Sequence, residues 1–168
     1  MKDGRLGVLP EVVAENPAAA ILYQELPGAI LDAKPALGEL TLSIAPAQIV
    51  DVCRVLKASG GFERVSGITA VDCWPREPRF EVVYLLHSIR KNTRLRLNFR
   101  LGEGEEIDSV CSVWRGANWY EREVFDLFGI RFRNHPNLER IMMPADWEGH
   151  PLRKDYPVHG HKYSYQEE

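Results

Sequence analysis

The strongest constraint on the fold is a segment of strictly alternating polarity at residues 93–100. One set of alternate positions holds Thr93, Leu95, Leu97 and Phe99, and the other holds Arg94, Arg96, Asn98 and Arg100. Successive side chains of a β-strand point to opposite faces, so this period of two predicts a strand with one apolar and one polar face. A chain with such a strand must build a sheet and cover one face of it, and we expect helices to supply the cover.

The segments around this strand have complementary patterns. Residues 39–44 alternate in the same way and predict a strand, and residues 46–59 carry an apolar stripe at helical spacing. Residues 62–74 predict another strand, and the apolar run FEVVYLLH at 80–87 predicts a central strand with both faces covered. The order of these elements predicts an α+β fold with a mixed or antiparallel sheet and helices packed on it.

A second helix is predicted for residues 118–129. Its apolar stripe consists of Tyr120, Val124, Leu127 and Phe128. Asn118 is expected to cap the first turn while Glu121 reaches back to it, and Gly129 is expected to end the helix.

The charged side chains of this helix allow two interpretations. They are Glu121, Arg122, Glu123 and Asp126. The plainer interpretation is a solvated or ion-paired face, in which Arg122 and Asp126 pair at a spacing of four residues. The alternative is a free-standing metal-dependent hydrolase, whose ligands would be the carboxylates Glu121, Glu123 and Asp126 together with histidines of the C-terminal region. These histidines are His150, His159 and His161.

The chain divides into three parts. Residues 1–38 are expected to form an N-terminal extension of helix and loops, and residues 39–128 an α/β body. Residues 129–168 are rich in proline and histidine but retain large apolar side chains, so they predict an extended C-terminal tail that docks on a partner. Its expected anchors are Phe132, Ile141, Trp147, Leu152 and Tyr156.

The composition and the motifs that are missing exclude several kinds of protein. The 168 residues are 45% hydrophobic and 27% charged, as in an ordinary globular domain, and the net charge of −3 argues against a basic nucleic-acid binder. Cys53, Cys73 and Cys111 are far apart, so no iron–sulfur or zinc site built from cysteines is expected. No apolar run approaches the roughly 18 residues of a membrane helix, and no nucleotide-binding or nucleophile-elbow motif is present. These observations point away from a self-contained enzyme.

Residues 119–157 have a distinctive sequence, WYEREVFDLFGIRFRNHPNLERIMMPADWEGHPLRKDYP. This run closely resembles the 30-kDa subunit of respiratory complex I, a family that includes the corresponding subunits of bacterial NADH:quinone oxidoreductases. The matching positions are Glu121-Arg122-Glu123, Asp126, Leu127-Phe128, His135, Arg140-Ile141 and the stretch from Asp146 to Pro157. The resemblance extends over about residues 28–157 and includes GITAVD at 67–72.

The resemblance implies a subunit with no catalytic residues, no metal and no cofactor of its own. In this family FMN and the iron–sulfur clusters belong to other subunits, and the chain lies in the hydrophilic arm beside the 49-kDa subunit that helps to form the quinone site. The implied location is peripheral, on the cytoplasmic side of the inner (plasma) membrane. The implied complex passes electrons from NADH to quinone and translocates protons. An equivalent subunit of a related membrane-bound hydrogenase is the alternative.

The same resemblance implies where the chain meets its partners, which are the 49-kDa subunit and other subunits of the peripheral arm. Motif residues are expected to serve docking and internal ion pairing. They are Glu121, Arg122, Glu123, Asp126, His135, Arg140, Ile141, Trp147, Leu152, Arg153, Lys154, Asp155 and Tyr156.

Overall fold

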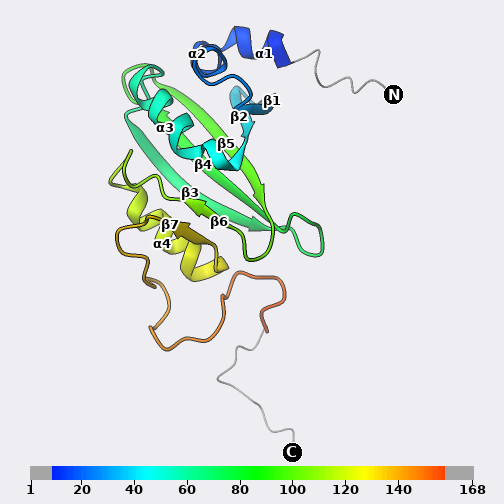
Figure 1. Ribbon diagram of the computed structural model, residues 1–168, viewed down its shortest axis with the longest axis vertical. Helices are drawn as coiled ribbons and strands as arrows, with labels where there is room; N and C mark the ends of the chain where they lie inside the picture. Colours follow the sequence, from blue (N-terminus) through cyan, green and yellow to red (C-terminus); the bar gives the residue numbers. More distant parts are fainter. Residues whose placement is uncertain (1–8, 158–168) are drawn as a thin grey trace, which may run out of the picture.

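The computed structural model describes residues 9–157, and Figure 1 shows how the helices and strands of that range are arranged. The helices are α1 (Leu9–Glu15), α2 (Pro17–Glu25), α3 (Ile49–Ala58), which follows the 3₁₀ turn η1 (Pro46–Gln48), and α4 (Ala117–Phe128). The strands are β1 (Ile30–Ala36), β2 (Glu39–Ile44), β3 (Arg64–Asp72), β4 (Phe80–Ser88), β5 (Thr93–Leu101), β6 (Glu106–Asp108) and β7 (Arg131–Arg133). None of the described helices is long and apolar enough to cross a bilayer.

Five strands form one mixed sheet in the order β1-β2-β5-β4-β3. β2 and β5 run parallel, and the other neighbouring pairs are antiparallel. This sheet, with helices packed on it, confirms the predicted α+β fold. β1 is not anticipated by the residue pattern, which places residues 30–36 in an N-terminal extension. The strand forms because Leu37 and Gly38 adopt the positive φ of a tight turn and because Pro35 is tolerated on an edge strand.

Helices α3 and α4 cover the same face of the sheet. In Figure 1, α3 lies in front of the central strands and α4 lies beside β3, β6 and β7. Tyr84, fully buried in the middle of β4, lies near both Cys53 of α3 and Glu121 of α4. The fully buried side chains between sheet and helices include Leu42, Ile49, Leu56 and Leu97. The core is therefore one layer between the sheet and its helices.

The expectation that β4 is covered on both faces is wrong. Buried positions alternate along the strand, and Leu85 on the second face keeps 36% of its surface exposed. The sequence of β4 does not show this alternation, because Val83 and Leu85 are apolar although they lie on the open face.

The start of α4 differs from the prediction, and its end agrees. The helix follows Gly116, which has no side chain and already has right-handed helical backbone angles, and Asn118 lies inside the first turn. A turn that ends with Ala117 N donating to Trp114 O leads directly into the helix, so an extended capping residue is absent there. Gly129 ends the helix at φ 79°, in the left-handed region that favours glycine.

The C-terminal segment begins inside the fold. β7 pairs in parallel with β6, and Ile130 and Phe132 belong to the main core. The expectation that a partner buries Phe132 is therefore wrong, because its own domain does so. Residues 134–157 follow without helix or strand. His159 and His161 lie outside the described residues.

Candidate functional site

Asp126, in the last turn of α4, is a buried carboxylate that organises the chain after the helix. Its Oδ2 accepts hydrogen bonds from the backbone N–H groups of Ile141 (2.9 Å), Met142 (2.7 Å) and Met143 (3.0 Å), and its Oδ1 accepts one from the Arg140 guanidinium (2.7 Å). A carboxylate at this end of a helix opposes the helix dipole. Burial by itself raises the pKa of Asp126, but these donors outweigh it and hold the pKa below its usual range.

The same segment also satisfies the end of α4. The last carbonyls of a helix lack partners within the helix and need donors from elsewhere. Here the C-terminal segment supplies these donors, and the positive charges of its two arginines also suit the negative end of the helix dipole. They are Arg140 (3.3 Å) and His150 (2.9 Å) to Asp126 O, Leu152 N (3.0 Å) to Leu127 O, and Arg153 (2.6 Å) to Phe128 O.

Two features of the structure favour glycine at position 129. Its φ of 79° disfavours other residues, and a Cβ atom there would lie 2.6 Å from the His150 ring and 2.8 Å from the Arg153 guanidinium. Any side chain at position 129 would therefore displace the two basic groups that cap the helix.

Arg79 forms a second anchor for the C-terminal segment. Its side chain is 2% exposed and donates to both oxygens of Asp72 (3.1 and 2.8 Å) and to both oxygens of Asp155 (3.1 and 2.6 Å). Glu103 accepts from it as well (3.0 Å), and Asp72 also accepts the backbone N–H of Lys154 (2.8 Å). The Arg79 hydrogen bonds are the largest influence on the pKa of Asp72, which lies well below its usual range. Residues 154 and 155 are thereby fixed to the β3–β4 end of the sheet.

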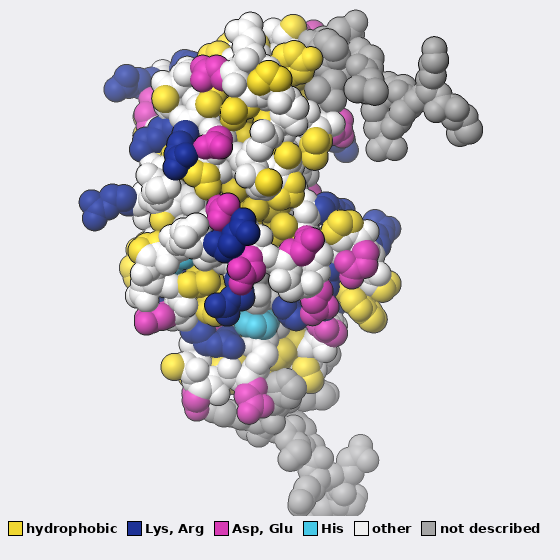
Figure 2. Space-filling view, in the orientation of Figure 1, with side chains coloured by type: hydrophobic (Ala, Val, Ile, Leu, Met, Phe, Trp, Pro, Cys, Tyr) yellow, Lys and Arg dark blue, Asp and Glu magenta, His cyan; other side chains and the backbone are white. Residues whose placement is uncertain are grey.

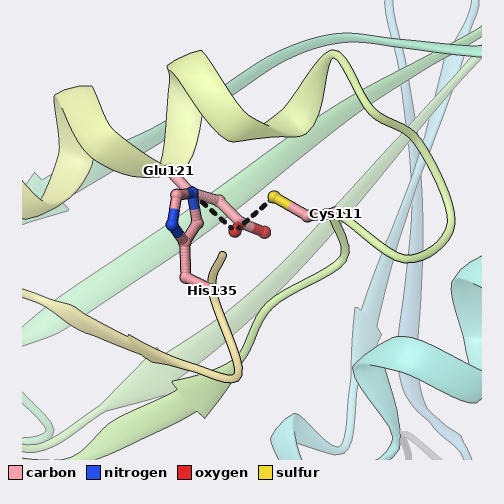
Figure 3. Close-up of side chains that lie close together, drawn as sticks. All are labelled: Cys111, Glu121 and His135. Carbon is pink, nitrogen blue, oxygen red and sulfur yellow. Dashed lines mark hydrogen bonds and ion pairs between the residues drawn. The ribbon is translucent and has the colours of Figure 1, made fainter. Parts of the chain in front are cut away.

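Glu121 is the centre of a third network, and Figure 3 shows its contacts with Cys111 and His135. Its carboxylate is fully buried and accepts hydrogen bonds from Val110 N (2.7 Å), the Ser109 hydroxyl (2.5 Å) and the Cys111 thiol (3.3 Å). His135 Nε2 lies 3.8 Å from Glu121 Oε2. Burial raises the pKa of Glu121, and the three donors offset this only in part. Burial likewise lowers the pKa of His135, so the imidazole is neutral at pH 7 and the contact is not an ion pair.

Cys111, Glu121 and His135 are also the one group of three metal-ligand side chains brought together within residues 9–157, with ligand atoms within 4.8 Å of one another. The three side chains already take part in hydrogen bonds within the protein. Burial raises the pKa of Cys111 to about 12, and its thiol donates to Glu121. His135 Nδ1 accepts the backbone N–H of Asn137 (3.0 Å). This geometry is that of a closed hydrogen-bond network.

Comparison with known proteins places this arrangement in a family. Residues 42–162 match the sequence model of the family described as "Respiratory-chain NADH dehydrogenase, 30 Kd subunit". The chain belongs to this family. An NADH-quinone oxidoreductase subunit of Geobacter sulfurreducens is 48% identical over 151 residues, which cover 88% of this chain and 93% of that protein. An NADH-quinone oxidoreductase subunit of Rhizobium meliloti is 45% identical over 137 residues, which cover 80% and 75%.

A solved structure from a different respiratory complex is also similar. A chain in the structure of the membrane-bound sulfane sulfur reductase, an archaeal respiratory membrane complex, superposes with a TM-score of 0.73 and is 30% identical. The match covers 86% of each chain. The family fold is thus shared by more than one kind of membrane-bound respiratory complex.

The structure assigns different positions to the acidic residues of the motif. Glu121 and Asp126 are buried rather than solvated, and Asp126 forms an ion pair with Arg140, whereas Glu123 is exposed. The predicted Arg122–Asp126 pair is also wrong: Arg122 instead donates to Glu139 O (3.1 Å) and lies 5.0 Å above the Trp119 ring. The three carboxylates proposed for the hydrolase alternative therefore do not share one site.

The remaining motif residues lie along the C-terminal segment. His135, Arg140, His150 and Arg153 contact the body as described, and Ile141, Trp147 and Tyr156 are half-buried. Leu152, Lys154 and Asp155 are exposed, although Lys154 and Asp155 are tied to Asp72 and Arg79. Figure 2 shows acidic and basic side chains interleaved around a histidine in the lower half of the molecule, where α4 and this segment lie.

Sequence reasoning missed Arg79, Asp72 and Ser109. Asp72 and Arg79 could have been recognised from their positions in the sequence. Asp72 is the last residue of β3 and Arg79 directly precedes β4, next to buried strand residues. Nothing in the local sequence identifies their third partner, Asp155, which lies 76 residues from Arg79.

Proposed function

We propose that this chain is a non-catalytic subunit of the hydrophilic arm of a proton-translocating NADH:quinone oxidoreductase and that it docks on the 49-kDa quinone-site subunit. On this proposal FMN and the iron–sulfur clusters are held by other subunits. The chain lies peripherally on the cytoplasmic side of the membrane. Its contribution to electron transfer from NADH to quinone is to hold the arm together beside the quinone site.

The observation that carries this proposal is an apolar surface on a segment that is already fixed in place. Trp119, Met142 and Leu152 are 62%, 61% and 51% exposed, although each lies on α4 or on a stretch hydrogen-bonded to α4. Large apolar side chains in such a place are typical of protein interfaces.

The polar anchors explain why this surface suits docking. An irregular segment normally loses conformational freedom when it binds, which weakens association. Here Asp126 fixes residues 141–143 and the end of α4 fixes residue 152 in the unbound chain. The segment is therefore preorganised, and the apolar contacts with a partner retain most of their favourable free energy.

The surroundings of the cysteines support the part of the proposal that assigns the iron–sulfur clusters to other subunits. Cys53 is buried in the core, where desolvation raises its pKa well above the usual range, and the Cys111 thiol donates to Glu121. Within residues 9–157 the one group of possible metal ligands contains a single cysteine, whereas iron–sulfur clusters are held by several.

The proposal is tested by co-expressing the full-length chain with the 49-kDa homologue of the same genome and measuring co-purification. Met142→Asp combined with Leu152→Asp is expected to lower co-purification strongly, because each change buries a charge at the interface. Leu37→Asp is the matched control, since Leu37 is fully exposed on the β1–β2 turn and aspartate tolerates its positive φ. Equal co-purification of the double variant and the control contradicts docking through this surface.

A second candidate function is the equivalent subunit of a related membrane-bound respiratory complex. The similarity to the archaeal sulfane sulfur reductase structure favours it, since that complex contains a chain of the same fold at 30% identity. The identity of the co-purifying chains separates the two candidates. A flavin-binding subunit that oxidises NADH supports the first, and a different electron-input subunit supports the second.

A further inference from the structure

The face of the sheet opposite α3 and α4 carries a cluster of basic side chains. Arg64 of β3 lies directly across from His87 of β4, and His87 lies directly across from Arg94 of β5. Arg96, two residues along β5, projects on the same face. The arginines of this cluster repel one another, so a compensating negative charge nearby is favourable. We name these four residues the basic corner.

The chain itself supplies little of that compensation. Glu39 lies 3.6 Å from Arg94 and 3.7 Å from Arg96, so one carboxylate is shared between two guanidinium groups. Arg64 forms no ion pair with any residue in the described range. The basic corner therefore holds three arginines against one acidic side chain.

The basic corner surrounds a hollow in the sheet surface, in which Leu85 is the one exposed apolar side chain among the described residues. A groove of about 510 Å³ lies over Leu85, with Ser66, Arg64 and Arg96 among its walls. Gly67 pairs with Leu85 beside the groove, and a Cβ atom there would meet Leu85 Cδ1 at 3.5 Å, an ordinary contact distance. Val83 extends the apolar strip along β4.

We propose that this groove binds a segment of a neighbouring subunit in which an apolar side chain is flanked by aspartate or glutamate. The apolar residue would cover Leu85 while the acidic residues face Arg64 and the Arg94–Arg96 pair. This inference rests on the proposed function, because it takes the occupant to be another subunit of the same complex. It adds a second interface on the side of the molecule away from α4 and the C-terminal segment.

A protein segment fits the groove better than a phosphate-bearing ligand. The groove offers Leu85 as an apolar contact, and its described lining residues include no phenylalanine, tyrosine or tryptophan ring on which a base could stack.

The test is photo-crosslinking in the intact complex, purified through the full-length chain with a photoreactive phenylalanine analogue in place of Leu85. The expected result is a crosslink to a segment of another subunit that contains aspartate or glutamate beside an apolar residue. Arg64→Glu combined with Arg94→Glu is expected to reduce this crosslink about tenfold. Arg54→Glu is the control, because Arg54 is exposed on α3, on the opposite side of the sheet.

A second variant covers part of Leu85 without changing charge. Gly67→Val places a side chain against Leu85 at an ordinary contact distance, in a strand that accepts β-branched residues, and is expected to reduce co-purification of the crosslinked subunit. If the chain co-purifies with its complex but position 85 crosslinks to lipid, to nucleic acid or to no chain, the inference is overturned while the proposed function stands. If the wild-type chain co-purifies with no other subunit, the proposed function fails first.

Discussion

Replacing Asp126 by asparagine should strongly destabilise the chain. An asparagine that keeps its oxygen toward the three amides of residues 141–143 turns its NH₂ group toward the Arg140 guanidinium, which is 17% exposed. Removing one partner of a largely buried ion pair costs about 3–5 kcal/mol, and the three amide bonds weaken because the acceptor is no longer charged. Arg140 keeps its bonds to two carbonyls, Asp126 O and Gly149 O, so we expect a loss of about 3 kcal/mol.

Two measurements on the full-length chain check this value. Urea unfolding at pH 7 gives the free energy of unfolding of Asp126→Asn relative to wild type. Native-state hydrogen exchange then reports whether the amides of Ile141, Met142 and Met143 exchange faster, as expected if the carboxylate protects them. Glu123→Gln removes the same charge from an exposed position of the same helix and should change the free energy of unfolding by no more than about 0.5 kcal/mol.

The outcome that refutes the reasoning is specific. If Asp126→Asn and Glu123→Gln unfold at the same urea concentration, and the three amides exchange at wild-type rates, the carboxylate does not hold the C-terminal segment. The preorganised docking surface would then lose its physical basis.

Three further predictions follow from the other buried groups. Arg79→Met should lower the free energy of unfolding in urea by about 3–5 kcal/mol, because Asp72 stays buried without its cation. Arg54→Met, which removes an exposed ion pair, should lower it by no more than about 0.5 kcal/mol. Equal losses would show that Arg79 is not the anchor. Because the pKa of Glu121 is raised, its contribution to stability is fully present below the unfolded pKa of about 4.3 and is lost as the pH rises through the folded pKa. The stability of wild type relative to Glu121→Gln should therefore fall from about pH 4.3 toward pH 7, and parallel pH profiles would disprove it. Leu97→Asp should cost several kcal/mol while Arg96→Ala stays within about 0.5 kcal/mol, since only Leu97 faces the core; similar effects in thermal unfolding would mean that the register of β5 is wrong.

Periodic patterns predicted much of the fold because they record which face of an element is buried. The alternation along residues 93–100 and the stripe along residues 46–59 correspond to β5 and α3, with the predicted faces in the core. β1 was less visible, since only Ile30 of its seven residues is buried and an edge strand therefore leaves little periodic signal.

The site was harder to predict, for an electrostatic reason. From sequence, a charged side chain on an amphipathic helix is assigned to solvent, because burial of a charge is costly without partners. Glu121 and Asp126 find those partners in segments that hold no periodic pattern, the turn at 109–111 and the stretch 140–143. Family resemblance singled out both residues without indicating that they are buried. Long-range contacts of this kind are fixed only once the chain has folded.

The measurement that tests the central claim most directly is purification of the full-length tagged chain from its native membrane in a mild detergent, with identification of every co-purifying chain. The account predicts equal amounts of the 49-kDa quinone-site subunit and of other hydrophilic-arm subunits, among them the flavin subunit that oxidises NADH. Recovery of the chain alone, or with partners outside any membrane-bound respiratory complex, would contradict it.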